Sequence, residues 1–195
     1  IHSAAAFNGV SSFNGGGLIG TGGLNVFLNN VSYTGRISVP AKENLTGVVS
    51  FGGIIGNAPH AVISNAYTKF NFNLSTARSD YRVNGDLEYI GGIAGYAKSI
   101  SKSTSEVVMV IDAMNIVQAG EYIGGLAGAV TDVKNSRSIG ALSINCFGTQ
   151  SCNNFGGLVG YLSGTVEKSY ADVSFKVECG GIQSCRGFGG LVGYD

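Results

Sequence analysis

The chain carries little charge, and its positive and negative residues balance. Only 12% of its 195 residues are charged, and 12 Lys and Arg offset 12 Asp and Glu. Proteins that bind nucleic acid need a clustered basic surface, which this composition does not indicate. No apolar run approaches the roughly 18 residues of a membrane span, so we expect none. A neutral surface with few charges opposes association only weakly, which suits a protein that packs against copies of itself.

Residues that support acid–base or nucleophilic chemistry are also scarce. The chain has two His and no Trp, and no pair among its scattered carboxylates stands out. We therefore expect no catalytic residue, no cofactor, no metal site and no enzymatic activity. His60 follows Pro59, and we expect it to be solvated in a turn. The spacing Gly15-x-Gly17-x-x-Gly20 fits a dinucleotide fingerprint, but no βαβ helix follows, so we interpret it as part of a repeat.

Glycine is abundant, at 32 residues, and much of it lies in one repeated phrase. The phrase reads apolar-Gly-Gly-apolar-apolar-Gly, and its second Gly recurs at intervals of 32 to 39 residues. Its copies begin at Phe51, Ile90, Ile123, Phe155 and Phe188, with a degenerate first copy at Gly15. A period of this length predicts a repeat architecture, in which each unit buries its apolar face against its neighbours.

Each period contains about three short segments with strand character. Val173 to Val177 alternates apolar and polar residues, as a strand with one buried face does, and Gly, Asn, Asp and Ser separate the segments. Helix is disfavoured because each helix-interior Gly costs about 1 kcal/mol relative to Ala. We therefore expect an all-β fold, a parallel β-solenoid (β-helix) of about five coils of 32–39 residues with three short strands per coil. The alternative is a propeller, whose blades repeat every 40 residues or so.

A solenoid of this kind makes residues 1–195 a single domain. We expect units at about 13–48, 49–87, 88–120, 121–153 and 154–186, a partial unit at 187–195, and the tail of a preceding coil at 1–12. Equivalent residues should stack about 4.8 Å apart. Two internal columns are predicted, one of Leu18, Ile54, Ile93, Leu126, Leu158 and Leu191, and one of Phe51, Ile90, Ile123, Phe155 and Phe188. A serine column is predicted from Ser32, Ser103, Ser136 and Ser169, with Ala66 in the same place.

The repeated phrase resembles the GLUG motif, which is named for its Gly-Leu-Gly signature. Gly156 to Tyr161 reads Gly-Gly-Leu-Val-Gly-Tyr, and Ser169-Tyr-Ala171 supplies the second half of the pattern. Residues 92–96 and 189–194 match only the first half, and the first two units depart most, through insertions at 40–47 and 76–86. The resemblance covers residues 15 to 195. It implies a secreted or surface-attached repeat protein, such as the stalk of an adhesin.

Four cysteines occupy equivalent positions in two successive units. Cys146 and Cys152 align with Cys179 and Cys185 at an offset of 33 residues. We favour the disulfides Cys146–Cys152 and Cys179–Cys185, each closing its own loop. The alternative is a ladder between coils, Cys146–Cys179 and Cys152–Cys185, and a zinc site is a third interpretation with poor ligand spacing.

Asn30, Asn44 and Asn73 begin glycosylation sequons, which count only for a protein of the secretory pathway. Disulfides and sequons both indicate an extracellular or cell-surface glycoprotein.

The chain begins and ends within a coil, which predicts open strand edges that can pair with another chain. We expect a mature or excised segment, because there is no initiator Met. Two explanations fit: a segment of a longer stalk, or a protomer that assembles head-to-tail into a filament. The function predicted from the sequence is structural or adhesive, with copies of the chain itself, and surface glycans, as the expected partners. The alternative is a carbohydrate-binding or carbohydrate-active solenoid at the cell surface.

Overall fold

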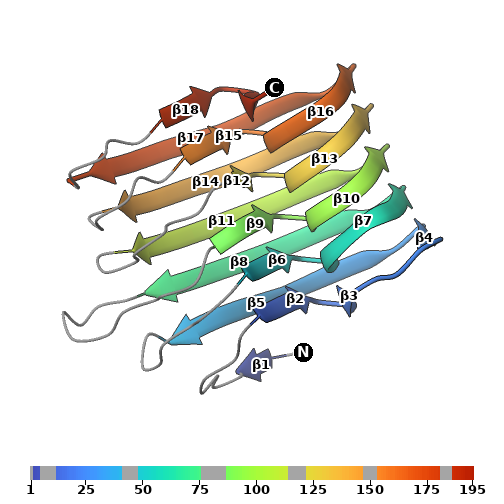
Figure 1. Cartoon of the computed structure of the whole chain (residues 1–195), viewed down its shortest axis with the longest axis horizontal. Helices are drawn as coiled ribbons and strands as arrows, with labels where there is room; N and C mark the ends of the chain where they lie inside the picture. Colours follow the sequence, from blue (N-terminus) through green and yellow to red (C-terminus); the bar gives the residue numbers. More distant parts are fainter. Residues whose placement is uncertain are drawn as a thin grey trace.

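The structure, a computed structural model, describes residues 2–4, 12–40, 48–75, 87–113, 122–146, 153–180 and 186–195. Within these ranges every regular element is a β-strand, and all strand pairs are parallel. The strands form three sheets, and each coil contributes a strand to each sheet in turn (Figure 1). The predicted parallel β-solenoid with three strands per coil is therefore confirmed.

The three sheets are named here in the order in which the chain visits them within one coil. The first sheet contains β2 (Ser12–Gly16), β6 (Val48–Gly52), β9 (Leu87–Gly91), β12 (Tyr122–Gly124), β15 (Asn153–Gly156) and β18 (Arg186–Gly189). The second contains β3 (Ile19–Thr21), β4 (Phe27–Asn29), β7 (Ile55–Ser64), β10 (Ala94–Ser101), β13 (Ala127–Lys134), β16 (Val159–Glu167) and β19 (Val192–Tyr194). The third contains β1 (His2–Ala4), β5 (Ser32–Pro40), β8 (Tyr67–Ser75), β11 (Thr104–Ala113), β14 (Arg137–Cys146) and β17 (Tyr170–Cys179).

Alternation of apolar and polar residues decides which face of each third-sheet strand is buried. In β8, Phe70, Phe72 and Leu74 are fully buried, whereas the alternating residues Lys69 and Asn71 face outward. Successive side chains of a strand point to opposite faces, so the apolar set fills the interior of the coil. The same alternation continues in the strands stacked on β8, because β8 pairs with β11, and β11 pairs with β14, in unbroken register.

The two predicted apolar columns run through the interior. Their central members are at most 1% exposed: Ile54, Ile93, Leu126 and Leu158 in one column, and Phe51, Ile90, Ile123 and Phe155 in the other. The end members differ. Leu18 and Phe188 are each 49% exposed, because they belong to the outermost coils and have a neighbouring layer on one side only. The prediction is right for the middle of the solenoid and wrong for these two residues, which are not internal.

The paired glycines form the corner between the first and second sheets. A Cβ on Gly124 would meet the carbonyl oxygen of Ala127, and a Cβ on Gly125 would meet Ser138 Oγ and the carbonyl oxygen of Gly157. These atoms are mostly backbone, which cannot move aside cheaply. Glycine is therefore required here because the backbone of one layer lies directly against that of the next.

The corner between the second and third sheets has a different construction. One residue per coil has a left-handed backbone: Asn30 (φ 58°), Asn65 (φ 50°), Lys102 (φ 49°), Asn135 (φ 49°) and Lys168 (φ 47°). The next residue is serine in three of these coils. Ser169 Oγ accepts a hydrogen bond from Ser136 N at 3.0 Å, Ser136 Oγ from Ser103 N at 3.1 Å, and Ser103 Oγ from Ala66 N at 3.0 Å.

This serine ladder confirms the predicted column except at its N-terminal end. Ser32 pairs with Tyr67, and Tyr67 pairs with Thr104, which places Ser32 one residue beyond the column. Val31 stands in the serine position of that coil, and its carbonyl oxygen accepts the hydrogen bond from Tyr67 N. The prediction for Ser32 was therefore wrong, because the first two coils are offset by 35 residues at this turn, whereas Ser32 and Ala66 are only 34 residues apart.

Candidate functional site

A groove lies along the corner between the second and third sheets and crosses three successive coils. It encloses about 390 Å³ and is lined by Lys102, Ser103 and Thr104 from one coil, Asn135, Ser136 and Arg137 from the next, and Lys168 and Tyr170 from the third. The serine hydroxyls are occupied within the ladder, since Ser103 donates to Ser101 O and Ser136 to Lys134 O. The charged and aromatic side chains therefore give this corner groove its chemical character.

Arg137 lies in the middle of the corner groove and bridges the coils on either side. Its Nε donates to Thr104 Oγ1 at 3.2 Å, and its Nη1 donates to Tyr170 Oη at 3.1 Å. The hydrogen bond from Arg137 to Tyr170, together with the nearby Glu106 charge, holds the pKa of the guanidinium above its ordinary value. Both hydrogen-bond acceptors are neutral hydroxyls, so they orient the guanidinium without cancelling its charge.

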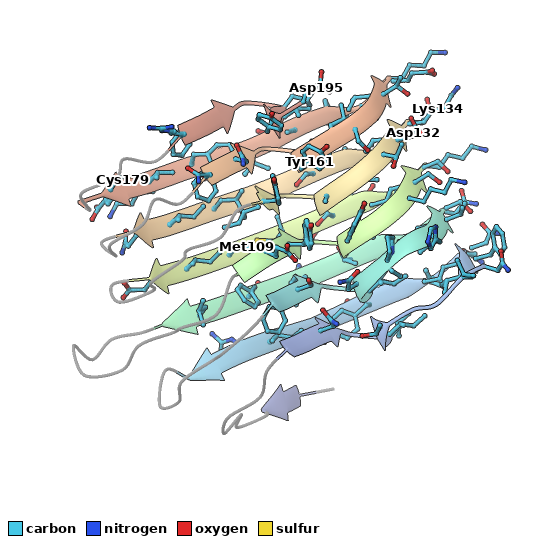
Figure 2. The ribbon with its side chains drawn as sticks, viewed as in Figure 1. Met109, Asp132, Lys134, Tyr161, Cys179 and Asp195 are labelled. Carbon is cyan, nitrogen blue, oxygen red and sulfur yellow. The ribbon has the colours of Figure 1, made fainter. Side chains whose placement is uncertain are left out.

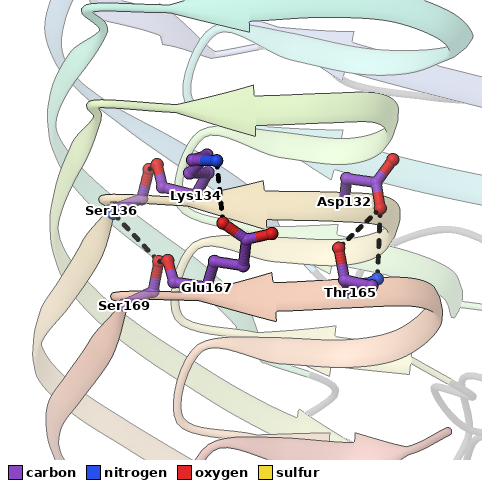
Figure 3. A network of polar contacts seen from close by, with 6 residues as sticks. All are labelled: Asp132, Lys134, Ser136, Thr165, Glu167 and Ser169. Atoms are coloured by element: carbon purple, nitrogen blue, oxygen red, sulfur yellow. Dashed lines mark hydrogen bonds and ion pairs between the residues drawn. The ribbon is translucent and has the colours of Figure 1, made fainter.

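The carboxylates nearest the corner groove each have a lysine partner of their own. Lys134 Nζ lies 2.7 Å from Glu167 Oε2, and Lys69 Nζ lies 3.7 Å from Glu106 Oε2. Figure 3 shows the first of these pairs beside the hydrogen bond of Ser136 to Ser169. The hydrogen bond and charge of Lys134 lower the pKa of Glu167, and those of Glu167 raise the pKa of Lys134.

Asp132 stabilises the irregular pairing between β13 and β16. Its Oδ1 accepts hydrogen bonds from Thr165 N at 3.1 Å and Thr165 Oγ1 at 3.0 Å (Figure 3). The register between β13 and β16 shifts here, since Val130 pairs with Leu162 while Asp132 pairs with Thr165. The Asp132 carboxylate thus accepts a hydrogen bond from a backbone N–H at the bulge, which is a structural role.

A row of tyrosines runs along the corner between the first and second sheets. Tyr89 stacks on Tyr122 with ring centroids 5.6 Å apart and planes at 10°, and Tyr161 (labelled in Figure 2) stacks on Tyr194 at 5.8 Å and 22°. Tilted contacts of 5.0 Å and 5.1 Å join Tyr96 to Tyr89 and Tyr122 to Tyr161. The neighbouring rings cover one another in part, whereas Tyr194 at the C-terminal end of the row is 54% exposed.

Apolar side chains are uncovered at the C-terminal end of the solenoid. Phe188 is 49% exposed, and Phe175 is 36% exposed. With Phe155, Gly189 and Gly190 they line a hollow of about 180 Å³. The opposite end likewise exposes Leu24 and Phe27.

The predicted cysteine site is only partly described. Cys179 (labelled in Figure 2) ends β17, and it is the register partner of Cys146 at the end of β14. Cys179 is disulfide-bonded. Cys152 and Cys185 lie outside the described residues, as does the side chain of Cys146, so both pairings remain predictions.

The three sequon asparagines also have different outcomes. Asn30 is exposed in the turn before β5, whereas Asn73 is half-buried on β8, with its Oδ1 shielded from solvent. Asn44 lies outside the described residues. Glycosylation stays a prediction at all three, and the geometry favours Asn30 over Asn73.

His60 and the glycine fingerprint can also be placed. His60 is exposed, as predicted, but it lies within β7 rather than in a turn. Pro59 precedes it where the register between β7 and β10 is interrupted, and such irregularities are where a strand tolerates proline. Gly15 and Gly20 lie in the parallel strands β2 and β3, as the repeat interpretation requires.

The corner groove and the full tyrosine row were not predicted from the sequence. A signal for the groove exists: Lys102, Asn135 and Lys168 recur at 33 residues. That signal gains meaning only when the register places Arg137 and Tyr170 beside them.

In the parts of the chain that the structure describes, no group of three or more His, Cys, Asp or Glu is placed to hold a metal ion. Nor do those parts contain a helix long and apolar enough to cross a membrane. No protein-family model, no curated protein and no solved structure matches the chain.

Proposed function

We propose that the chain is a structural scaffold, a stiff β-solenoid segment that extends by stacking end to end. The observation that carries this proposal is the uncovered core at the C-terminal end, where Phe175 and Phe188 continue the interior columns without a layer above them. An exposed apolar surface that continues a packed core favours a partner with the same cross-section.

The partner we propose is a second copy of the chain. Among the described residues, β17, β18 and β19 form the C-terminal edge of the three sheets, and β1, β2, and β3 with β4 form the opposite edge. A second copy would place its β1 on β17, its β2 on β18 and its β3 on β19, so that parallel pairing continues through the junction. The contact is head-to-tail, and repetition of it would produce a filament. In a longer chain, further coils would occupy the same edges.

Sedimentation velocity of the chain over a range of micromolar concentrations tests this proposal. We expect concentration-dependent association that Phe188→Asp abolishes. Val108→Asp is the matched control, since Val108 is 47% exposed on the side of the solenoid, far from either end. A parent protein that stays monomeric, or equal association of both variants, would contradict the proposal.

An extracellular or cell-surface location belongs to the same proposal. It is supported by the aligned cysteine pairs, the disulfide at Cys179 and the exposed sequon at Asn30. In this setting, disulfides at the coil ends would brace the scaffold. The adhesin-like stalk implied by the GLUG resemblance is the form of this function that we propose.

The alternative is a carbohydrate-binding or carbohydrate-active solenoid. The tyrosine row is the feature that would carry binding of neutral sugars, yet its rings stack on one another and leave few faces for a sugar ring. A glycan-array screen separates the two functions, because saturable binding of a neutral oligosaccharide would favour the alternative.

A further inference from the structure

We propose that the corner groove between the second and third sheets binds a linear acidic polysaccharide, through Lys102, Arg137 and Lys168. This site goes beyond the scaffold role proposed above, and it lies on the side of the solenoid rather than at its ends. Three observations carry the proposal: the charge of the groove, the backbone conformation of its lysines, and the spacing of its cations.

The corner groove has an excess of positive charge in a protein that has none overall. Its lining includes three cations and no carboxylate. The two glutamates nearby are already paired, Glu106 with Lys69 and Glu167 with Lys134. Because the whole chain balances 12 positive against 12 negative residues, this local excess is a feature of the corner and not of the composition.

The two lysines occupy positions that suit another residue better. Lys102 and Lys168 have φ of 49° and 47°, in the column where three other coils have Asn. Asn adopts the left-handed region more readily than residues with longer side chains, so lysine carries a conformational cost at these sites. Residues with strained backbone conformations concentrate at functional sites, and at these two positions the strained residue carries a positive charge.

The spacing of the cations favours a linear ligand. Lys102 and Lys168 lie two layers apart, which is about 10 Å at the usual strand separation, and Arg137 comes from the layer between them. A single small anion would need the three cations to converge, whereas a polymer with repeated carboxylates or sulfates can meet them in succession along the solenoid axis. Tyr170, which is 50% exposed, adds an aromatic surface at one end of the groove.

A polysaccharide fits these features better than a nucleic acid does. Proteins that hold nucleic acid through its backbone commonly neutralise about 6–10 phosphates, and the corner groove offers three cations on a chain without net charge. The ligand class is therefore an acidic glycan, either carboxylated or sulfated.

Binding measurements on the whole chain test the proposal. Polygalacturonate and heparin serve as the carboxylated and sulfated probes, neutral dextran as the uncharged control, and single-stranded DNA as the nucleic-acid probe. We expect saturable binding of at least one acidic polysaccharide, none of dextran, and affinity that falls roughly tenfold or more between 50 and 200 mM salt.

Substitutions at the left-handed positions then separate binding from folding. The double variant Lys102→Asn/Lys168→Asn should lose at least tenfold in affinity while its melting temperature stays equal or rises, because Asn suits the left-handed backbone. Lys98→Asn, which removes one exposed charge outside the groove lining, should bind like the parent. Arg137→Gln is a second binding variant and should weaken binding even if the double variant folds poorly.

Three results would overturn the proposal. One is the absence of saturable binding by either acidic polysaccharide at 50 mM salt. Another is equal affinity of the parent, the double variant and Arg137→Gln. The third is binding of single-stranded DNA alone, which would assign the corner groove to nucleic acid instead.

Discussion

Truncation of Leu126 is the sharpest test of the packed interior. Leu126 is fully buried in the column between Ile93 and Leu158. Its carbonyl oxygen accepts a hydrogen bond from Ile93 N at 2.8 Å, and its N–H donates to Leu158 O at 2.8 Å. These bonds fix the spacing of the layers, so the cavity left by Leu126→Ala cannot collapse. We expect a loss in unfolding free energy of about 3–5 kcal/mol, the upper part of the range for buried leucines.

Urea unfolding followed by circular dichroism measures this loss. With a slope of about 2–3 kcal/mol per molar urea, the midpoint should fall by roughly 1 M or more. Leu24→Ala is the matched control, because Leu24 is 75% exposed, and its effect should stay within about 0.5 kcal/mol. A Leu126→Ala midpoint no lower than that of Leu24→Ala would refute the interior column.

Three further predictions concern the ladder, the ion pair and the cysteines. Ser136→Ala removes the acceptor for the buried Ser103 N–H, so urea unfolding should show a loss of about 1–3 kcal/mol, against little change for the exposed Ser174→Ala. The pKa of Glu167 is lowered in the folded state, so its stabilising contribution exists at neutral pH and disappears as the pH falls through that lowered pKa. The pKa of Lys134 is raised, so its contribution is lost only as the pH rises through that raised pKa. Glu167→Gln should therefore be less stable than the parent at pH 7 and equal to it in strong acid, and a gap that persists there would contradict this. Non-reducing peptide mapping should join Cys179 to Cys185, and a Cys146–Cys179 peptide would instead establish the ladder that their register permits.

The repeated phrase was enough to predict most of the fold because each copy has the same local structural role. Its glycines are required wherever one backbone lies against the next, as at Gly125, and its apolar residues fill one column, as at Leu126. Such constraints act within one unit and its neighbours, so spacing alone was enough to predict the register. Ser32 was placed wrongly because the first two coils are offset by 35 residues at this turn, so that Val31 and not Ser32 is the equivalent of Ala66.

The corner groove could not be predicted in the same way. Its cations come from three coils, and only the register of β11, β14 and β17 aligns Thr104, Arg137 and Tyr170. The left-handed backbone of Lys102 and Lys168 is not predicted by their residue type either, because lysine does not favour such a turn. The exposure of Phe188 depends on what covers the end of the solenoid, and its own sequence context matches that of buried Phe155.

The distance between spin labels at positions 36 and 174, introduced as unnatural amino acids, tests the in-register solenoid most directly. Arg36, Asn71, Val108, Ala141 and Ser174 are successive register partners on the third sheet, and both end residues are exposed. Four layers at about 4.8 Å predict a backbone separation of about 19 Å in a single narrow distribution. A broad distribution, or a distance that does not increase steadily through the intermediate positions, would contradict the solenoid and the corner groove that depends on it.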